Sequence, residues 1–373
     1  MAPKVTKIAL SGGPGGGKSS LKEELVPWLE SVGYYVVFVP EAATQIMQSG
    51  PHWSHPDDVG GSFQQAILRH IISNEDLLEE AARRLCGDKN IVMLCDRGAP
   101  EIEAYMGREQ ATEVLGRMGL TRGELLARYH AVIFMVTAAD GAPKAFEAAK
   151  ANNPKRTESV EQAVARDKLT QRCWLGAESL SIIQNSGDGE EAWRRKVEQA
   201  KRAVGRKLGI PEPVEIERKY ALTVFSMQGI AYEEAEIEQI YLKRTSLEVE
   251  RRIRRRWFAG HTLYFYTEKV ERSEGVRAEK EERISWAEYE RLKQEADPAL
   301  MTLRKYRRYF LYEGQYFELD VFSGFSRMLT LLEIELPTLD TPVKLPPRFK
   351  AHDVTGSKQY SNYCIARGFL NAS

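Results

Sequence analysis

The sequence has few cysteines and no long hydrophobic stretch. Its four cysteines, Cys86, Cys95, Cys173 and Cys364, stand too far apart to form the CxxC pattern of zinc or redox sites. Apolar runs such as residues 131–136 are much shorter than the roughly 20 residues that span a bilayer, and the apolar stretch near the N-terminus leads into glycines rather than a cleavage site. These absences predict free thiols, no signal peptide, no transmembrane segment and a cytoplasmic location.

The sequence also has no excess of charge of either sign. Lysine and arginine together number 53, and so do aspartate and glutamate. This balance argues against a protein that coats DNA, so we expect no nucleic-acid partner. With 373 residues, of which 43% are hydrophobic and 28% charged, the chain is typical of soluble folded protein and long enough for two or three domains.

The first part of the chain alternates strand and helix patterns. Short apolar segments predict buried parallel strands at 7–10, 34–39, 90–95, 131–136 and 180–184. Helices are predicted at 62–85 and 196–208, and Ser62 with Gln65 resembles a capping box at the start of the first of them. This alternation predicts a doubly wound α/β domain over residues 1–210.

A different pattern follows the linker at residues 209–213, which contains one glycine and two prolines. Charged or polar residues now alternate with apolar or aromatic ones, as in antiparallel strands. The clearest segments are 214–222, 249–257, 262–269, 304–311, 315–321 and 330–336. We therefore expect a second, antiparallel domain over residues 211–373.

A glycine-rich loop follows the first predicted strand. Gly12, four further residues and then Gly17-Lys18-Ser19 fit the Walker A pattern, which binds a nucleoside triphosphate such as ATP or GTP. Backbone N–H groups would wrap the phosphates, Lys18 would reach the β- and γ-phosphates, and the Ser19 hydroxyl would hold Mg²⁺. The predicted nucleotide-binding residues are Gly12, Gly15, Gly17, Lys18, Ser19, Ser20, Asp96 and Arg156.

The residues outside the loop have alternative explanations. Asp96 ends a predicted strand, where it could hold Mg²⁺ or simply start a turn. Glu41 also ends a strand, but a helix N-terminus favours glutamate in any case. Arg156 and Arg166 could cover the nucleotide or lie on a solvated helix face. The guanine-selecting Asn-Lys-x-Asp motif is missing after the fourth strand, so the sequence does not choose between ATP and GTP.

In the second domain, charged residues recur at alternate strand positions. The simple interpretation is a solvent-exposed charged face. The alternative is a closed barrel with a charged lumen, in which carboxylates bind Mg²⁺ or Mn²⁺ while arginines and lysines bind phosphate oxygens. On this interpretation Arg252 and Arg254 point into the lumen, whereas Arg251 and Arg255 face solvent.

The ordered charges resemble the CYTH, or triphosphate tunnel metalloenzyme, superfamily. The matching residues are Glu215-x-Glu217-x-Lys219, Arg252-Ile-Arg254, Lys269, Arg277-x-Glu279-x-Glu281, Lys305-x-Arg307, Asp320 and Glu333-Ile-Glu335. The resemblance implies an eight-stranded antiparallel tunnel that binds a triphosphate or polyphosphate with Mg²⁺ or Mn²⁺. It also implies the roles of individual residues: metal ligands at Glu215, Glu217, Asp320, Glu333 and Glu335; phosphate ligands at Lys219, Arg252, Arg254, Lys269, Lys305 and Arg307; and catalytic roles for Lys219, Glu217 and Glu335.

The first domain resembles the P-loop domain of ribosylnicotinamide kinases and of TRPL translocation defect proteins. The matching segments are Val39-Pro40-Glu41-Ala42-Ala43, Cys95-Asp96-Arg97-Gly98, Val136-Thr137-Ala138-Ala139 and Arg156-Thr157-Glu158. At Pro100-Glu101-Ile102-Glu103 the chain departs from these relatives, which tend to carry an aspartate there. The domain order is most similar to the TRPL proteins, which are associated with GTP and phosphoinositide binding and with membrane-protein trafficking.

Two hypotheses about function follow. The first is a metal-dependent phosphohydrolase that acts on an inorganic or organic triphosphate in the tunnel, while the P-loop domain binds ATP or GTP as a regulator or as a second catalytic centre, an NTPase or a kinase. The second is a non-enzymatic, nucleotide-regulated module that binds phosphoinositide headgroups.

Overall fold

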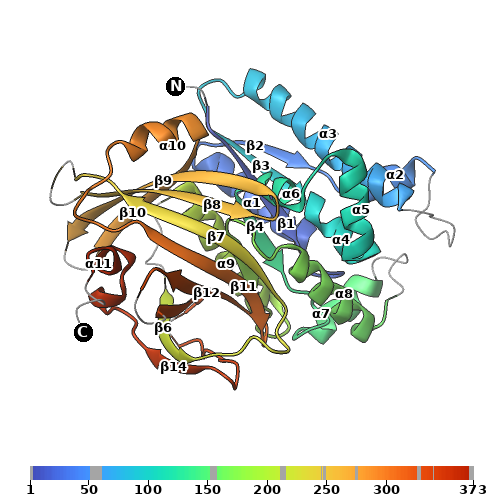
Figure 1. Ribbon diagram of the computed structural model, residues 1–373. Helices are drawn as coiled ribbons and strands as arrows, with labels where there is room; N and C mark the ends of the chain where they lie inside the picture. The colour runs from blue at the N-terminus through green and yellow to red at the C-terminus, as the bar shows by residue number, and fades with distance from the viewer. Residues whose placement is uncertain are drawn as a thin grey trace. The chain divides into compact units, whose positions relative to one another are not determined.

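The computed structural model describes residues 3–50, 61–151, 158–210, 216–244, 246, 249–273, 276–325, 329–338 and 340–368, with backbone only for 270–273 and 276–279. The chain divides into two compact units, Met1–Glu212 and Pro213–Ser373 (Figure 1). Among the described residues, no helix combines the length and the apolar character needed to cross a membrane.

The first unit is built on a parallel sheet with the strand order β2-β3-β1-β4-β5. The strands are β1 (Val5–Ser11), β2 (Tyr35–Val39), β3 (Ile91–Asp96), β4 (Ala131–Met135) and β5 (Leu180–Ile183). Every residue of β4 and the first five of β3 are buried, as expected for central parallel strands covered on both faces. The predicted doubly wound α/β fold is confirmed.

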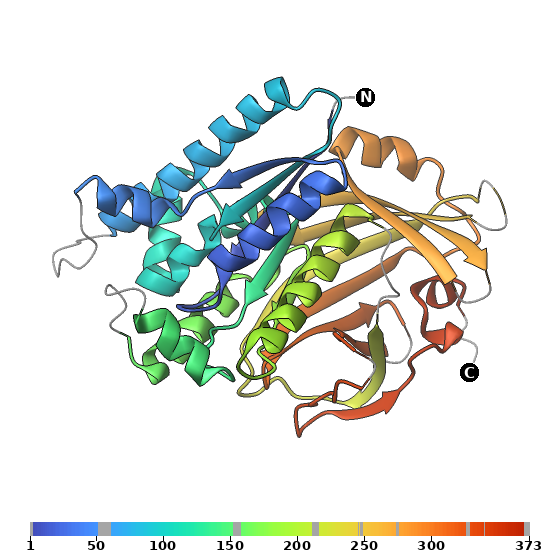
Figure 2. The same ribbon diagram turned by 180° about the vertical axis from the view of Figure 1, so that it is seen from behind.

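Helices connect these strands. Their bounds are α1 (Lys18–Ser31), α2 (Ala42–Gln48), α3 (Ser62–Leu85), α4 (Ile102–Met106), α5 (Arg108–Met118), α6 (Arg122–Ala127), α7 (Pro143–Ala151), α8 (Val160–Cys173) and α9 (Glu190–Leu208), with a 3₁₀ turn η1 (Ala99–Glu101) after β3. Helices α1 and α9 lie side by side over one face of the sheet (Figure 2). Leu21, Leu25 and Leu29 of α1 and Val197 of α9 join the core cluster of the strands there.

Helix α3 has the predicted bounds but a different N-terminus. Its N-cap is Gly61, whose φ of 72° is left-handed, and no side chain caps the helix. Ser62 is therefore already the first helical residue and cannot cap it. The predicted capping box of Ser62 and Gln65 is wrong.

The second unit is built on an antiparallel sheet of nine strands in the order β10-β9-β8-β7-β11-β12-β13-β6-β14. The strands are β6 (Glu217–Val224), β7 (Tyr232–Tyr241), β8 (Val249–Phe258), β9 (His261–Ser273), β10 (Val276–Ile284), β11 (Leu303–Tyr312), β12 (Gln315–Ser323), β13 (Leu329–Glu335) and β14 (Lys350–Asp353). Two helices, α10 (Trp286–Lys293) and α11 (Asn362–Ala366), and a 3₁₀ turn η2 (Lys358–Tyr360) complete the unit.

This sheet confirms the predicted antiparallel fold, but the expected closed eight-stranded barrel differs in detail. Among the described residues, no ladder joins the two edge strands β10 and β14, so backbone pairing does not close the sheet. Strand β14 is the short added edge, formed by residues close to the C-terminus.

Apolar side chains pack on both faces of this sheet. On one face Phe310, Phe317 and Leu332 form a core with Phe349. On the other face Leu303, Phe322 and Leu331 pack against Ile365 of α11. This second cluster shares its face with the charged residues described below, because side chains two residues apart in a strand point the same way. Helix α11 thus covers the apolar end of a face whose remainder is charged.

Candidate functional sites

The glycine-rich loop joins β1 to α1. It contains the predicted residues Gly12, Gly15, Gly17, Lys18, Ser19 and Ser20. Gly12 has φ 142°, and a Cβ atom there would lie 2.1 Å from the Met135 carbonyl oxygen, so only glycine fits. Lys18 and Ser19 begin α1, where the backbone N–H groups of a helix N-terminus favour an anion.

Lys18 lies folded over this loop. Its ammonium donates a hydrogen bond to the Gly12 carbonyl at 3.0 Å. Burial, with a smaller effect from Arg97, lowers the pKa of Lys18 to about 8. The charged form is therefore held less firmly than in an exposed lysine, and a bound phosphate would stabilise it.

Asp96 stands beside the loop, at the end of β3 and in register with Leu10 of β1. Burial raises the pKa of Asp96. Its Oδ1 atom is buried and has no hydrogen-bond partner within the described part of the chain. A buried carboxylate oxygen without a partner is costly in a folded protein, so this atom marks a place for a ligand group or water.

Two buried side chains that the sequence analysis did not identify hold the loop from behind. Asp167 of α8 accepts hydrogen bonds from the backbone N–H groups of Gly13, at 2.7 Å, and Thr137, at 3.0 Å. Lys196 of α9 donates to the carbonyl of Gly16 at 3.2 Å. Both come from helices far along the chain, so no local motif includes them.

A pattern in the sequence could have predicted that Lys196 is buried. It donates to the Val136 carbonyl and to Asn185 Oδ1, each at 2.7 Å, and burial lowers its pKa to about 8. It stands four residues before Ala200 on the buried face of α9. A lysine on the apolar side of an amphipathic helix was the available sign of a buried cation.

A charged cluster lies next to the loop. Arg97 donates to Glu41 at 2.5 Å and to Glu101 at 2.9 Å, and it lies 3.4 Å from the Gly12 carbonyl oxygen. Although burial alone would raise the pKa of Glu41, Arg97 keeps it below its usual value. Arg97 has φ 68°, a strained conformation for a residue with a side chain. The cluster fixes the segment after β3 against the glycine-rich loop.

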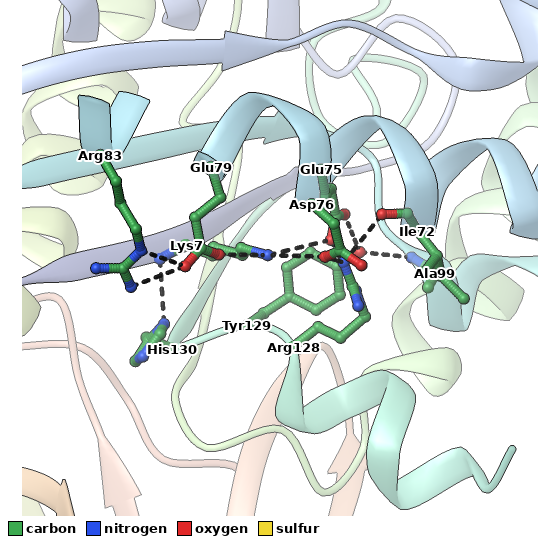
Figure 3. A network of polar contacts seen from close by, with 10 residues as sticks. All are labelled: Lys7, Ile72, Glu75, Asp76, Glu79, Arg83, Ala99, Arg128, Tyr129 and His130. Atoms are coloured by element: carbon green, nitrogen blue, oxygen red, sulfur yellow. Dashed lines mark hydrogen bonds and ion pairs between the residues drawn. The ribbon is translucent and has the colours of Figure 1, made fainter. Parts of the chain in front are cut away.

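A network of polar contacts also reaches the segment after β3, at Ala99 (Figure 3). Glu75 of α3 is fully buried and accepts hydrogen bonds from the Tyr129 hydroxyl at 2.6 Å and from Arg128 at 2.8 Å. The Tyr129 hydroxyl in turn accepts from the backbone N–H of Ala99 at 2.8 Å. Lys7 lies 3.9 Å from Glu75. Because its charges are compensated, we assign this network a structural role.

Arg156 and Arg166 are the two arginines that could cover the nucleotide. Arg156 lies outside the described residues. Arg166 of α8 donates to the Ala104 carbonyl and lies over the Tyr105 ring, 4.8 Å from its centre. Its guanidinium therefore packs on α4.

In the second unit, the register of the strands places the predicted charges on one face. Register partners of an antiparallel ladder share a face, and so do alternate residues along each strand. The decisive partners are Glu217 with Glu335, Lys219 with Glu333, Glu333 with Glu318, Arg307 with Asp320, and Lys269 with Glu250. We call this the charged face; it carries the predicted residues Glu217, Lys219, Arg252, Arg254, Lys269, Lys305, Arg307, Asp320, Glu333 and Glu335. Glu215 lies outside the described residues.

Arg307 is the centre of the charged face. It binds both oxygens of Asp320 at 2.6 Å, approaches Glu333 at 3.1 Å and donates to Glu318. Lys305 lies 2.5 Å from the same Asp320, which is 1% exposed. Although burial alone would raise the pKa of Asp320, Arg307 and Lys305 hold it well below its usual range. Solvent-exposed charges would not be buried to this extent, so the exposed-face interpretation is wrong at these positions.

Lys219 extends the network onto β6. Its ammonium lies 2.7 Å from Glu333 and 3.6 Å from Glu217. Burial alone would lower the pKa of Lys219, but Glu333 and Glu217 raise it above its usual value. Lys219 therefore remains charged at neutral pH.

Arg254 has capacity for a further ligand. One terminal nitrogen lies 3.0 Å from Glu281, and the guanidinium stacks over Phe265 at 4.7 Å. Its Nε atom is buried and has no hydrogen-bond partner in the part of the chain that is described. A buried guanidinium with an unused donor is suited to a phosphate oxygen.

Arg256 and Tyr316 also lie on the charged face, and the sequence analysis did not identify them. Arg256 donates to the Tyr309 hydroxyl at 3.0 Å and is 6% exposed. The Tyr316 hydroxyl is buried without a partner among the described residues, and burial raises its pKa. Arg256 follows Arg252 and Arg254 at the same two-residue spacing. The strand period could therefore have predicted that Arg256 shares their face.

On the opposite face of β8, Arg251 and Arg255 were both predicted to face solvent, but they differ in exposure. Arg255 is partly exposed and lies 3.4 Å from Glu236, as expected for a surface pair. Arg251 does not face solvent, because it contacts the Tyr266 hydroxyl at 3.1 Å and Glu295 at 2.9 Å and is mostly buried. The prediction that Arg251 is a solvent-facing side chain is wrong.

One relative with a described activity matches part of this chain. A protein described as an inorganic triphosphatase, from Nitrosomonas europaea, is 32% identical over 155 residues, which are 41% of this chain and 96% of the relative. The chain belongs to the inorganic triphosphatase family. A crystal structure described as an inorganic triphosphatase is 31% identical and covers 42% of this chain and 96% of its own, with a TM-score of 0.33.

Two other matches involve different kinds of protein. A family model described as an AAA domain matches residues 7–192. A thymidylate kinase from Ehrlichia chaffeensis is 15% identical and covers 49% of this chain and 94% of its own, with a TM-score of 0.32. The AAA-domain match covers the glycine-rich loop and β1 to β5.

The charged face of this triphosphatase-family chain also allows a test of the predicted metal site. Among the described residues, no three His, Cys, Asp or Glu side chains are grouped to hold a metal ion. Both oxygens of Asp320 and of Glu333 contact cationic side chains. Glu217 and Glu335 are register partners on neighbouring strands, and Glu217 also lies 3.6 Å from Lys219. Because Mg²⁺ commonly takes one or two carboxylates together with water and substrate phosphates, this pair suits Mg²⁺ or Mn²⁺.

Proposed function

We propose that the charged face hydrolyses a triphosphate, inorganic or organic, with Mg²⁺ or Mn²⁺, and that the glycine-rich loop binds ATP or GTP. The observation that carries the first part is that Arg254, Lys305 and Arg307 lie on one face with carboxylates, with Lys305 buried and the two arginine side chains only 17% and 11% exposed. Such charges are expensive to bury unless they are paired or bind a ligand. Membership of the inorganic triphosphatase family supports the same substrate class.

The residues of the charged face divide into two roles under this proposal. Arg254 and Lys219 bind phosphate oxygens and stabilise the negative charge that develops on them. Asp320 holds Arg307 at a fixed position by a two-pronged contact, so that the guanidinium is oriented before the substrate arrives. A water oxygen then forms a bond to the terminal phosphorus and gives up a proton to solvent. The bond from this phosphorus to its bridging oxygen breaks, and the diphosphate part leaves with the bonding electron pair.

Glu217 and Glu335 would hold the divalent ion in this proposal. The ion would supply charge neutralisation at the phosphate oxygens and lower the pKa of a bound water. Asp320 and Glu333 serve chiefly to position Arg307 and Lys219. This differs from the roles that the family resemblance implied for them.

The nucleotide-binding part rests on the loop. Gly12 makes the turn, Lys18 and the first turn of α1 provide the anion site, and Asp96 stands beside them. These features suit either ATP or GTP. The likeness of the whole chain to TRPL translocation defect proteins stays a prediction.

The test is phosphate release by the full chain from inorganic triphosphate, with and without Mg²⁺ or Mn²⁺. Glu217→Gln and Glu335→Gln are expected to lower kcat at least a hundredfold, because each removes one of the two carboxylates that hold the ion. Glu234→Gln is the matched control, since Glu234 lies outside the charged face in a surface pair with Arg308. Lys18→Ala should leave this hydrolysis unchanged.

Two results would contradict the proposal. Wild-type turnover in both glutamine variants at saturating Mg²⁺ would exclude their metal role. Binding of inositol phosphates by the wild-type chain without any triphosphate hydrolysis would favour the non-enzymatic phosphoinositide-binding module.

A further inference from the structure

Three polar side chains on the charged face have no part in the hydrolysis as proposed. They are Arg256 of β8, Tyr309 of β11 and Tyr316 of β12, and we call them the tyrosine–arginine cluster. Tyr309 follows Arg307 by two residues and Tyr316 precedes Glu318 by two, so both tyrosines share the face of these charged neighbours. The rings of Tyr309 and Tyr316 are nearly parallel, with centres 6.2 Å apart. The guanidinium of Arg256 lies over the Tyr309 ring, 5.2 Å from its centre.

The cluster has an excess of hydrogen-bond donors. The Tyr309 oxygen accepts a hydrogen bond from Nε of Arg256 at 3.0 Å, which leaves its own proton without an acceptor among the described residues. The Tyr316 oxygen is buried and has no hydrogen-bond partner in the described part of the chain. A buried O–H group without an acceptor costs free energy in a folded protein. Two O–H donors beside a cation therefore suit a ligand that carries acceptors and negative charge.

The Tyr316 hydroxyl keeps its proton at neutral pH. Burial raises the pKa of Tyr316 well above its usual value, Glu318 and Tyr309 raise it further, and Arg256 and Arg307 lower it only in part. The group is therefore a neutral hydrogen-bond donor rather than a phenolate. It faces cations and a carboxylate at the same time, as a group beside a bound anion would.

The strand register places the cluster beside the residues proposed to hold the substrate and the ion. Glu318 is the register partner of Glu333, and Glu333 is the partner of Lys219. Because β12 and β13 are antiparallel, the step from Glu318 to Tyr316 runs in the same direction as the step from Glu333 to Glu335. Tyr316 therefore stands on the side of Glu335, the proposed metal ligand. A triphosphate held by Lys219 and the ion would lie next to the cluster.

We propose that the tyrosine–arginine cluster binds one phosphate group of the triphosphate: the hydroxyl groups of Tyr309 and Tyr316 donate to its oxygens, and Arg256 supplies positive charge. A phosphate group suits the cluster because its charged oxygens accept hydrogen bonds from both hydroxyl groups without competing for them with a donor. This rests on the proposed function of the charged face and adds three substrate-binding residues to it. The alternative occupant is water, which would satisfy the hydroxyl groups without contributing to affinity for the triphosphate.

Tyr316→Phe is the decisive variant, because it removes one hydroxyl group and keeps the ring beside Tyr309. In the full chain, kcat/KM for inorganic triphosphate with Mg²⁺ should fall about tenfold, and so should the affinity for it, measured by calorimetry without a divalent ion. The unfolding temperature without ligand should stay the same or rise, since the lost hydroxyl has no partner in the described part of the chain. A residue with a purely structural role would lower the unfolding temperature together with the affinity.

The other members of the cluster and a matched control complete the series. Tyr309→Phe should weaken binding to a similar extent but also lower the unfolding temperature, because Arg256 then loses its contact with the Tyr309 hydroxyl. Arg256→Gln should weaken binding at least tenfold, and Arg256→Lys should weaken it less, because lysine keeps the positive charge. Tyr306→Phe is the control for both tyrosine variants, since Tyr306 is exposed on the opposite face of β11 and should change neither affinity nor turnover.

The outcomes separate this proposal from the proposed function. Wild-type affinity and turnover in Tyr316→Phe would overturn the role of Tyr316 and indicate that its hydroxyl binds water. An equal loss in Tyr306→Phe would also overturn it, because the effect would then not depend on the charged face. If the wild-type chain binds the triphosphate without hydrolysing it, the proposed function fails, and the affinities of the variants alone decide the role of the cluster. If the wild-type chain neither binds nor hydrolyses the triphosphate, both proposals fail.

Discussion

The glycine-rich loop of the first unit and the charged face of the second both suit phosphate groups, but they are assembled in different ways. The loop is a continuous stretch of chain whose backbone N–H groups form the anion site, and its shape depends on glycine at positions such as Gly12. The charged face collects side chains from strands spread over more than 100 residues, among them Lys219 of β6 and Glu333 of β13. The first is a local structure, and the second exists only after the sheet has formed.

The two sites also compensate their charges differently. On the charged face, Arg307 and Lys305 bind Asp320, and Lys219 binds Glu333, so most charges already have a partner of opposite sign. Beside the loop, Asp96 and Glu101 each keep a buried oxygen without a partner among the described residues. The charged face is therefore stabilised by its own ion pairs, whereas two carboxylate oxygens beside the loop have no such partner among the described residues.

The largest expected effect is a loss of stability when an ion pair of the charged face is broken. Arg307→Ala leaves Asp320 buried without its two-pronged partner, and breaking a buried pair from one side costs about 3–5 kcal/mol in free energy of unfolding. Arg308→Ala is the matched control on the same strand, because Arg308 forms a partly exposed pair with Glu234 and should cost less than about 1 kcal/mol. Urea titration of the full chain measures both values.

Comparable losses for the two variants would contradict the distinction between the charged face and the outer face. So would a stable Arg307→Ala variant in which Lys305 alone compensates Asp320. A double variant, Arg307→Ala with Asp320→Ala, should recover part of the loss, because the central pair is then removed from both sides, although Lys305 loses its contact with Asp320.

The same contrast explains how much the sequence could predict. The loop and the five parallel strands were predicted because each is encoded by neighbouring residues, such as the apolar run 131–136. The two-residue period also placed Arg252 and Arg254 on one face, and the register is consistent with this placement. Local pattern could not predict that Asp167 and Lys196 support the loop, because these contacts join helices to a loop more than 150 residues away.

Other features were also missed because they depend on contacts between segments that are distant in the sequence. The sequence did not show that Arg251 is buried, because its partners Tyr266 and Glu295 come from β9 and from the segment after α10. A cavity beside the glycine-rich loop was also not predicted, since its walls come from α2, α3 and α4. The departure at Pro100-Glu101-Ile102-Glu103 was noted, yet only the structure places Glu101 in the cavity.

A smaller effect concerns ligand binding on the charged face. Arg254→Ala should lower kcat/KM for inorganic triphosphate by about tenfold to a hundredfold, as expected for one charged hydrogen bond worth roughly 1.5–3 kcal/mol. Arg255→Ala, on the opposite face of the same strand, should change it less than about fivefold. Equal losses for the two variants would mean that the triphosphate binds elsewhere.

The smallest expected effect is a pH dependence of nucleotide binding by the loop. The pKa of Lys18 is lowered to about 8 without a ligand, and a bound phosphate should raise it. Below pH 8 the lysine is already charged, so the affinity should not depend on its titration. Above pH 8 binding must take up a proton, so the affinity for ADP or GDP should fall, by at most about tenfold for each pH unit.

Two neighbouring groups need a control in this measurement. Lys196, which holds the loop, also has a pKa lowered to about 8, and Arg97 lies close to Lys18 but stays charged throughout. Lys18→Arg keeps a permanent positive charge at the loop, so it should bind the nucleotide with a nearly constant affinity between pH 8 and pH 9.5. The same decline in Lys18→Arg as in the wild type would assign the pH dependence to Lys196, and no decline in the wild type would contradict the lowered pKa of Lys18. Because Arg307 of the proposed triphosphate site stays charged throughout this range, a decline confined to nucleotide binding would separate the two sites by their chemistry.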